Sequence, residues 1–174
     1  MTTWKIDPVH SEVKFKVKHL VVSSITGHFN QFNATAQTAN GDFSDGKFAF
    51  EADINSIDTK NEQRDGHLKS PDFFDASNHP KLTFASKSVN KKSANEFEVI
   101  GDLTIRGTKK EAKLDATYHG TVKGFGGVDV AAFEITGKIN RQDFGLTWSA
   151  LTEAGGVVVG DDVKFEVTAE FNKA

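Results

Sequence analysis

The sequence predicts an all-β fold, an eight-stranded antiparallel barrel with a short helical insertion between the third and fourth strands. Eight segments alternate apolar and polar residues with a period of two, the pattern of a strand with one buried face. No long amphipathic helix is available to cover the apolar faces, so these faces must pack against one another. A sheet closed on itself does this and removes its edges, and a two-sheet sandwich is the alternative.

The first two predicted strands show the pattern most clearly. In 13–19, Val13, Phe15, Val17 and His19 share one face, and the intervening positions are lysines. In 25–38, the apolar parity changes near Asn30, which indicates an extra residue and a bend in the strand.

The remaining strands are expected around 48–54, 82–84, 97–105, 112–118, 131–139 and 163–171. Alternation stops over 65–84. Asn61 can cap a short helix through Leu68 that ends at Ser70, and Ser70-Pro71 can begin a further helical turn. A helical turn could direct the adjacent Phe73 and Phe74 to the same side, so this segment is either a lid over a cavity or a plug in a solid core. The segment 141–160 is expected to be irregular.

Composition excludes several classes of function. The 174 residues (19.0 kDa) fit one domain, 1–174, with a substantial core. The net charge of −3 gives no basic footprint for nucleic acid, and the absence of cysteine excludes thiol chemistry. No apolar run is long enough for a membrane span, and the N-terminus lacks the features of a signal peptide. We therefore expect a cytoplasmic protein as the chain is written, or a periplasmic one if a leader was removed.

Small residues recur on the inward parity of the predicted strands. They either make room for the rings of the fifteen phenylalanines or leave a cavity, and their number favours a cavity. The members of this set are Gly27, Ala34, Ala36, Ala52, Gly101, Ala112, Ala116, Ala131, Gly137 and Ala169.

Five motifs, in order along the chain, resemble those of the YceI-like family. They are WKIDPVHS at 4–11, VKFKVKHL at 13–20, DGHLKSPDFFD at 65–75, GDLTIRGT at 101–108 and RQDFGL at 141–146. The resemblance implies an elongated, lipocalin-like barrel that binds a long isoprenoid or similar amphiphile, such as a polyprenyl diphosphate, a quinone or a fatty amide. It implies no catalytic residues, and many members of the family are periplasmic.

From strand parity and this resemblance we predict a binding site for the lipid inside the barrel. The predicted ligand-binding residues are Phe15, Val17, His19, Phe29, Phe50, Phe73, Phe74, Phe84, Leu103, Phe133, Ile135, Phe144 and Trp148. We expect no catalytic residue, no metal and no cofactor other than a bound polyisoprenoid, quinone or fatty-acid-type lipid. The expected partner is this lipid, with nucleic acid excluded and a homodimer left open.

Three polar side chains are open to two interpretations. His19 is either a hydrogen-bonded core histidine or a contact to the ligand's head group. Arg106 and Arg141 either pair with a diphosphate or are ordinary solvated or salt-bridged arginines, and we favour the second. We also expect His67 to anchor the insertion against Asp7 or Asp65.

Two other functions are consistent with the same fold. One is an enzyme, for instance an isomerase or hydrolase, that uses His19 or an aspartate on an apolar substrate in the same cavity. The other is a stress-related structural or interaction protein with a solid core. The histidines lack metal-ligand spacing, and no nucleophile or nucleotide-binding motif is present in the sequence.

Overall fold

The computed structural model describes residues 1–20, 22–150 and 158–174. The strands are β1 (Thr2–Ile6), β2 (Glu12–His19), β3 (Ser23–Phe29), β4 (Phe32–Thr38), β5 (Lys47–Asp53), β6 (Ile57–Asp58), β7 (Lys81–Lys91), β8 (Glu96–Ile105), β9 (Thr108–Lys123), β10 (Asp129–Asn140) and β11 (Val159–Lys173). The helices are α1 (Glu62–Lys69) and the short 3-10 turns η1 (Pro8–His10), η2 (Ile54–Ser56), η3 (Phe125–Gly127) and η4 (Arg141–Phe144).

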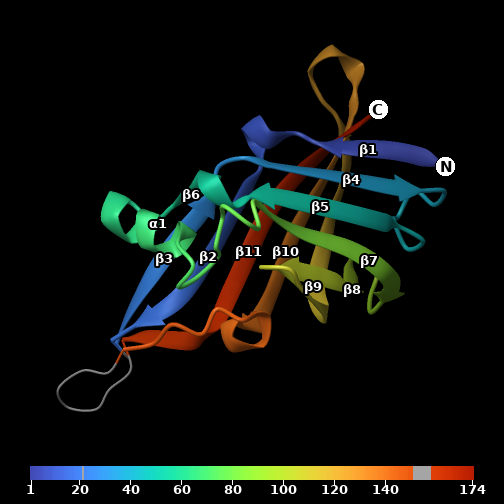
Figure 1. Ribbon diagram of the computed structural model, residues 1–174. Coiled ribbons are helices and arrows are strands. Elements are labelled where there is room, and N and C mark those ends of the chain that lie inside the picture. The colour runs from blue at the N-terminus through green and yellow to red at the C-terminus, as the bar shows by residue number, and fades with distance from the viewer. Residues whose placement is uncertain (21, 151–157) are drawn as a thin grey trace.

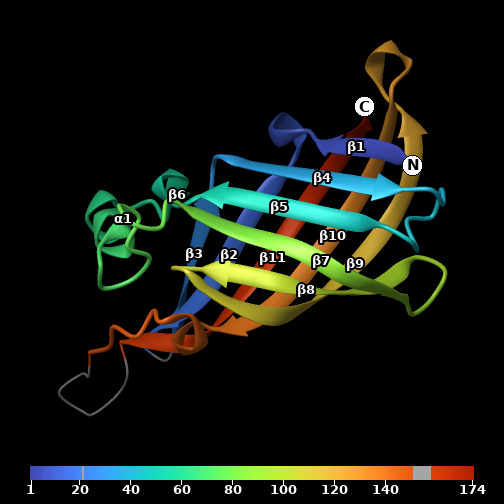
Figure 2. The same ribbon diagram turned by 45° about the vertical axis from the view of Figure 1, so that its right-hand side comes forward.

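Eight of these strands form a closed antiparallel barrel (Figures 1 and 2). Their order is β1-β4-β5-β7-β8-β9-β10-β11, and β11 returns to pair with β1. The predicted barrel is therefore confirmed, and the sandwich alternative is wrong. None of the helices in the described part of the chain has the length and hydropathy to span a bilayer.

The start of the chain forms a strand that was not predicted. We expected the first strand at 13–19, but β1 precedes it, and the turn η1 separates β1 from β2. Both strands pair with β11, β1 near its C-terminal end and β2 nearer its N-terminal end. Alternation does not predict a strand at 2–6, because so short a segment holds only two inward apolar side chains, Trp4 and Ile6, which are buried.

The strand predicted at 25–38 is two strands in the structure, so the parity change near Asn30 marks a break between strands and not an extra residue within one. It falls between β3 and β4, so β3 pairs with β2 whereas β4 pairs with β1 and β5. The break bends the chain where the barrel wall changes partner.

The insertion between β5 and β7 begins as predicted. Asn61 caps α1 by accepting a hydrogen bond from the Arg64 backbone N–H (3.0 Å), and Ser70 ends the helix. The second helical element expected after Pro71 is instead a hydrogen-bonded turn, in which the Phe73 N–H donates to the Ser70 carbonyl (3.0 Å).

The insertion lies where the barrel wall lacks a strand partner. In the described residues, the outer edge of β3 pairs only with the two residues of β6, through His28 and Phe29. The Phe74 ring of the insertion lies edge-to-face with that of Phe29 beside this edge (centroids 6.2 Å apart), and Ala76 is buried in the same apolar cluster. The insertion thus covers the side of the barrel between β3 and β7 (Figure 2).

Aromatic rings fill the opposite end of the barrel. Phe43, in the β4–β5 connection, is 1% exposed. Its ring centroid lies 5.3 Å from that of Trp4, 5.3 Å from that of Tyr118 and 5.0 Å from that of Phe133. These contacts, tilted or edge-to-face, pack this end as a solid core.

Candidate functional site

A cavity of about 230 Å³ lies inside the barrel. Its wall is apolar except for parts of Lys14, Thr35 and Arg141. Strands from every side of the barrel contribute to it, together with Leu68, Phe73 and Phe74 of the insertion. Such a wall can exclude water from a hydrocarbon chain and offers it no hydrogen bonds.

The structure places most of the predicted binding residues on this wall. Those that line it are Phe15, Val17, Phe29, Phe50, Phe73, Phe74, Phe84, Leu103, Phe133, Ile135 and Phe144. His19 and Trp148 do not line it. The wall also includes residues outside the predicted set, among them Ile6, Leu114, Ala116, Leu146 and Phe165. Inward strand parity is the signal that would have found most of them.

His19 occupies the last position of β2, outside the cavity wall. Its backbone pairs with Ser23 and Val159, and its carbonyl accepts a hydrogen bond from the Ser23 hydroxyl (3.0 Å). The half-buried side chain therefore sits at the end of the strand, where the strand face no longer encloses the interior. Neither of the two roles considered for this histidine is supported by its position.

The insertion directs two adjacent phenylalanines at the cavity. Phe73 is buried and Phe74 half-buried, and both line the wall. Their backbone is tied to α1, since the Phe74 N–H donates to the Leu68 carbonyl at 2.9 Å. The segment is both lid and plug, because it closes the side of the barrel and adds its own rings to the core.

A cluster of three rings joins the insertion to the segment after η4. The His67 ring centroid lies 5.1 Å from that of Phe73 and 4.9 Å from that of Trp148, and the Phe73 and Trp148 centroids are 5.4 Å apart. His67 also bonds to Asp72 at 2.8 Å, so the expected contact with Asp7 or Asp65 is wrong. Trp148 thus holds the insertion in place from outside the cavity wall.

Arg106 joins the same two segments through their backbones. One terminal nitrogen of its guanidinium donates to the carbonyl of Phe73 (2.9 Å) and to that of Gly145 (3.2 Å). It stands in the β8–β9 turn, where Arg106 and Gly107 both have positive φ (50° and 73°). This geometry places the guanidinium between the two segments, where it bonds to both. Among the described residues, the guanidinium has no carboxylate partner.

Arg141 is buried beside the cavity, with 4% of its surface exposed. It donates to the carbonyls of Leu146 (2.6 Å), Trp148 (2.8 Å) and Gly160 (2.9 Å). Its second terminal nitrogen lies 3.3 Å from the Asp161 carboxylate. Burial lowers the pKa of Arg141, and the nearby charge of Asp161 opposes this shift. The guanidinium therefore organises the segment after η4, in keeping with the salt-bridged interpretation.

Glycines on the inward parity make room for phenylalanine rings. Gly27 is paired across strands with Phe15, and Gly137 with Phe165. A Cβ atom would lie 2.3 Å from a ring atom of Phe15 at Gly27, and 2.2 Å from one of Phe165 at Gly137. Gly27 and Gly137 therefore make room for phenylalanine rings, the first of the two roles expected for the small inward residues. Ala34, Ala116 and Ala169 line the cavity, which is the second role.

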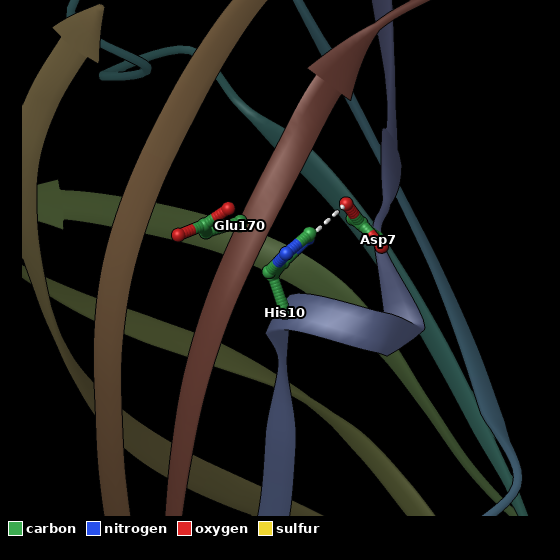
Figure 3. A group of neighbouring side chains, drawn as sticks. All are labelled: Asp7, His10 and Glu170. Carbon is green, nitrogen blue, oxygen red and sulfur yellow. Dashed lines mark hydrogen bonds and ion pairs between the residues drawn. The ribbon is translucent and has the colours of Figure 1, made fainter. Parts of the chain in front are cut away.

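A polar group of Asp7, His10 and Glu170 lies outside the barrel near η1 (Figure 3). Asp7 caps η1 by accepting from the Val9 N–H (3.0 Å), and its other carboxylate oxygen bonds to His10 Nδ1 (2.8 Å). This hydrogen bond raises the pKa of His10 and lowers that of Asp7. Both Asp7 oxygens are thus used to fix the turn between β1 and β2.

The family comparison agrees with this architecture. The model of the YceI-like domain matches residues 4–171. A UPF0312 protein of Staphylococcus aureus (strain MSSA476) is 42% identical over 173 residues, which cover 99% of this chain and 98% of the relative. A UPF0312 protein of Staphylococcus epidermidis is 40% identical over the same share of both chains.

Solved structures show the same fold. BcnA of Burkholderia cenocepacia has a TM-score of 0.82 at 21% identity, covering 95% of this chain and 98% of its own. A YceI protein of Campylobacter jejuni has a TM-score of 0.78 at 31% identity, covering 90% of each chain. A polyisoprenoid binding domain of Saccharophagus degradans has a TM-score of 0.72 at 14% identity and covers 98% of each. With the family match over nearly its whole length, the chain belongs to the YceI-like family.

Proposed function

We propose that this protein binds and carries a long-chain amphiphile, with the hydrocarbon tail in the barrel cavity. The observation that carries the proposal is the cavity of about 230 Å³ with its nearly continuous apolar wall. Burial of a tail there would contribute roughly 25 cal/mol per Å² of apolar surface before the costs of association are subtracted. The family and the polyisoprenoid binding domain of similar fold support this class of ligand.

The wall favours a plain hydrocarbon tail. A polar group within the tail would lose its hydrogen bonds to water and gain none from such a wall. A polyisoprenoid, an isoprenoid quinone tail or a fatty-acid derivative meets this requirement. The head group would remain towards one end of the cavity, outside the apolar section.

The proposed role is binding without catalysis. The described residues that line the cavity include no histidine, aspartate or glutamate, and Lys14 and Arg141 add almost no polar surface to the wall, so a tail there has little contact with acid or base groups. His19, the residue considered for an enzyme, lies outside the wall. A solid-core interaction protein is disfavoured for a different reason, because its interior would leave no such cavity.

The test is solvent extraction of the purified protein followed by mass spectrometry, compared with a variant whose cavity is filled. Leu114 lines the cavity, and its neighbour Lys113 is exposed on the same strand. We expect a stoichiometric amphiphile in the wild type and in Lys113→Trp, and its loss in Leu114→Trp. Ala116→Leu is a smaller filling change for the case in which the tryptophan prevents folding.

Clean extracts of the wild type, together with no uptake of added prenyl lipids, quinones or fatty acids, would contradict the proposal. For the enzyme alternative, His19→Ala is the deciding variant. We expect it to retain the bound lipid in unchanged chemical form, whereas accumulation of a modified lipid in the wild type alone would favour catalysis.

A further inference from the structure

The outer face of β2, β11 and β10 carries a row of lysines near the β2–β3 turn. Lys16 is paired across strands with Lys164, and Lys164 is paired in turn with Lys138. All three are exposed, and they share the outer face with Lys14 and Lys18 of β2. A sheet seldom places like charges directly opposite one another, because the arrangement is destabilising.

Few carboxylates balance this row. Glu166 lies 3.6 Å from Lys14, and Asp162 lies 3.8 Å from Lys138. Among the described residues, no carboxylate lies within 4.0 Å of Lys16, Lys18 or Lys164. The chain as a whole has a net charge of −3, so this face is basic on an otherwise acidic protein. Its positive field is complementary to an anionic surface.

Exposed apolar side chains stand at the end of the same strand. Leu20 is 45% exposed and Val22 is 87% exposed, both in the turn that follows β2. At about 3.3 Å per residue, Lys18 lies roughly 7 Å before Leu20 and Lys16 roughly 13 Å before it along an extended chain. In a bilayer, the boundary of the acyl chains lies deeper than the anionic phosphates. A protein that enters tip first would place its apolar tip at this boundary and the lysines behind the tip at the level of the phosphates.

We propose that this face docks on an anionic phospholipid membrane surface. Leu20 and Val22 enter the boundary between head groups and acyl chains, and Lys16, Lys18 and Lys164 face the phosphates. The β2–β3 turn lies at the end of the barrel away from the β9–β10 tip (Figure 1). The residues that line the cavity include Val17 and Val163, on the two strands that reach this end. A polyanion such as nucleic acid would engage the lysines but would gain nothing from the two apolar side chains.

Co-sedimentation with vesicles tests the lysines. We expect the wild type to bind vesicles that contain phosphatidylglycerol, to bind phosphatidylcholine vesicles weakly, and to dissociate as salt rises. Each membrane-facing lysine should contribute about fivefold in affinity, so Lys16→Gln with Lys164→Gln should weaken binding roughly 25-fold. The matched control is Lys109→Gln with Lys113→Gln, which removes the same charge from exposed positions on β9.

The apolar tip has its own test. Leu20 has a φ of 51°, a conformation that asparagine tolerates, so Leu20→Asn with Val22→Ser removes the apolar surface without straining the turn. We expect this variant to lose affinity for anionic vesicles several-fold while its salt dependence is retained.

Several results would overturn the docking proposal. They are no binding of the wild type to anionic vesicles, equal losses in the β9 control, and binding to duplex DNA as tight as to the vesicles with no effect of the tip change. The proposal does not depend on what fills the cavity. The lipid content measured by extraction is a separate readout, so failure of docking and failure of lipid binding can be told apart.

Discussion

At the scale of single residues, the interior is shaped by pairs of a glycine and a phenylalanine on adjacent strands. The rings of Phe15 and Phe165 lie over Gly27 and Gly137, where a side chain would collide with them. These rings also line the cavity. The glycines therefore set how far each ring extends into the cavity.

Gly137→Ala should accordingly overpack the interior. We expect a loss of roughly 1–3 kcal/mol in the free energy of unfolding, together with displacement of the Phe165 ring and a smaller lipid load. Urea unfolding and lipid extraction measure the two effects. Gly66→Ala is the control, because Gly66 lies within α1 with nothing within 4 Å of the added carbon, and it should stabilise by about 0.5–1 kcal/mol. Equal losses in both variants would contradict this interpretation.

The Asp7–His10 pair makes a prediction about pH. The hydrogen bond with Asp7 raises the pKa of His10 above 6.5, so charged His10 stabilises η1 below that value, and the contribution is lost as pH rises through the higher folded pKa. The same bond lowers the pKa of Asp7 below 3.8, so its contribution is present above 3.8 and is lost as pH falls through the lower folded pKa. In Asp7→Asn, the NMR titration of His10 should move down towards the ordinary histidine value. An unchanged titration would show that the pair does not form in solution.

At the scale of elements, two irregular segments, 66–79 and 141–148, lie against the barrel and hold each other. Arg106 joins their backbones, and the rings of His67, Phe73 and Trp148 join their side chains. Neither segment has strand partners of its own in the described residues, so its position depends on these contacts.

Arg106→Asn removes the guanidinium while keeping a residue that tolerates positive φ. Two carbonyls then lose their donor, and we expect a cost of roughly 1–3 kcal/mol that falls on these two segments. Hydrogen exchange should increase in 66–79 and 141–148 but not in β8 or β9. Uniform acceleration across all strands would instead indicate a general loss of stability.

The sequence predicted the insertion's position, its cap at Asn61 and the inward direction of both phenylalanines. It could not predict the contacts of Trp148 or Arg106, because they join segments that are distant in the chain and carry no periodic pattern. His19 shows the opposite error. Strand parity placed it inward, but at the last residue of β2 the alternating face extends beyond the enclosed interior. Part of the irregular segment predicted at 141–160, residues 151–157, lies outside the described residues.

At the scale of the whole molecule, the barrel is closed by the strand that the sequence pattern did not reveal. β1 pairs with β4 on one side and with β11 on the other. Seven of the eight barrel strands could be predicted from alternation, whereas closure depends on register between the two ends of the chain. A short strand with two apolar residues carries too little periodicity to predict that pairing.

Lys5 offers a way to test closure without changing the core, because its side chain is exposed. The Thr3 carbonyl accepts from the Ala174 N–H (2.9 Å), and the Asp7 N–H donates to the Glu170 carbonyl (2.8 Å). Alternate residues of a strand direct their backbone groups to the same side, so the Lys5 N–H also faces β11. Lys5→Pro therefore removes a donor from the closing ladder.

We expect Lys5→Pro to lower the free energy of unfolding by roughly 1–3 kcal/mol, since a β11 carbonyl is left without its partner. The weakened edges of β1 and β11 should also favour association between molecules, because unpaired strand edges are templates for pairing. Urea unfolding and size-exclusion chromatography measure these effects, with Lys5→Ala as the control that keeps the backbone N–H. If the proline variant is as stable and as well dispersed as the alanine variant, the Lys5 hydrogen bond to β11 does not contribute to closing the barrel.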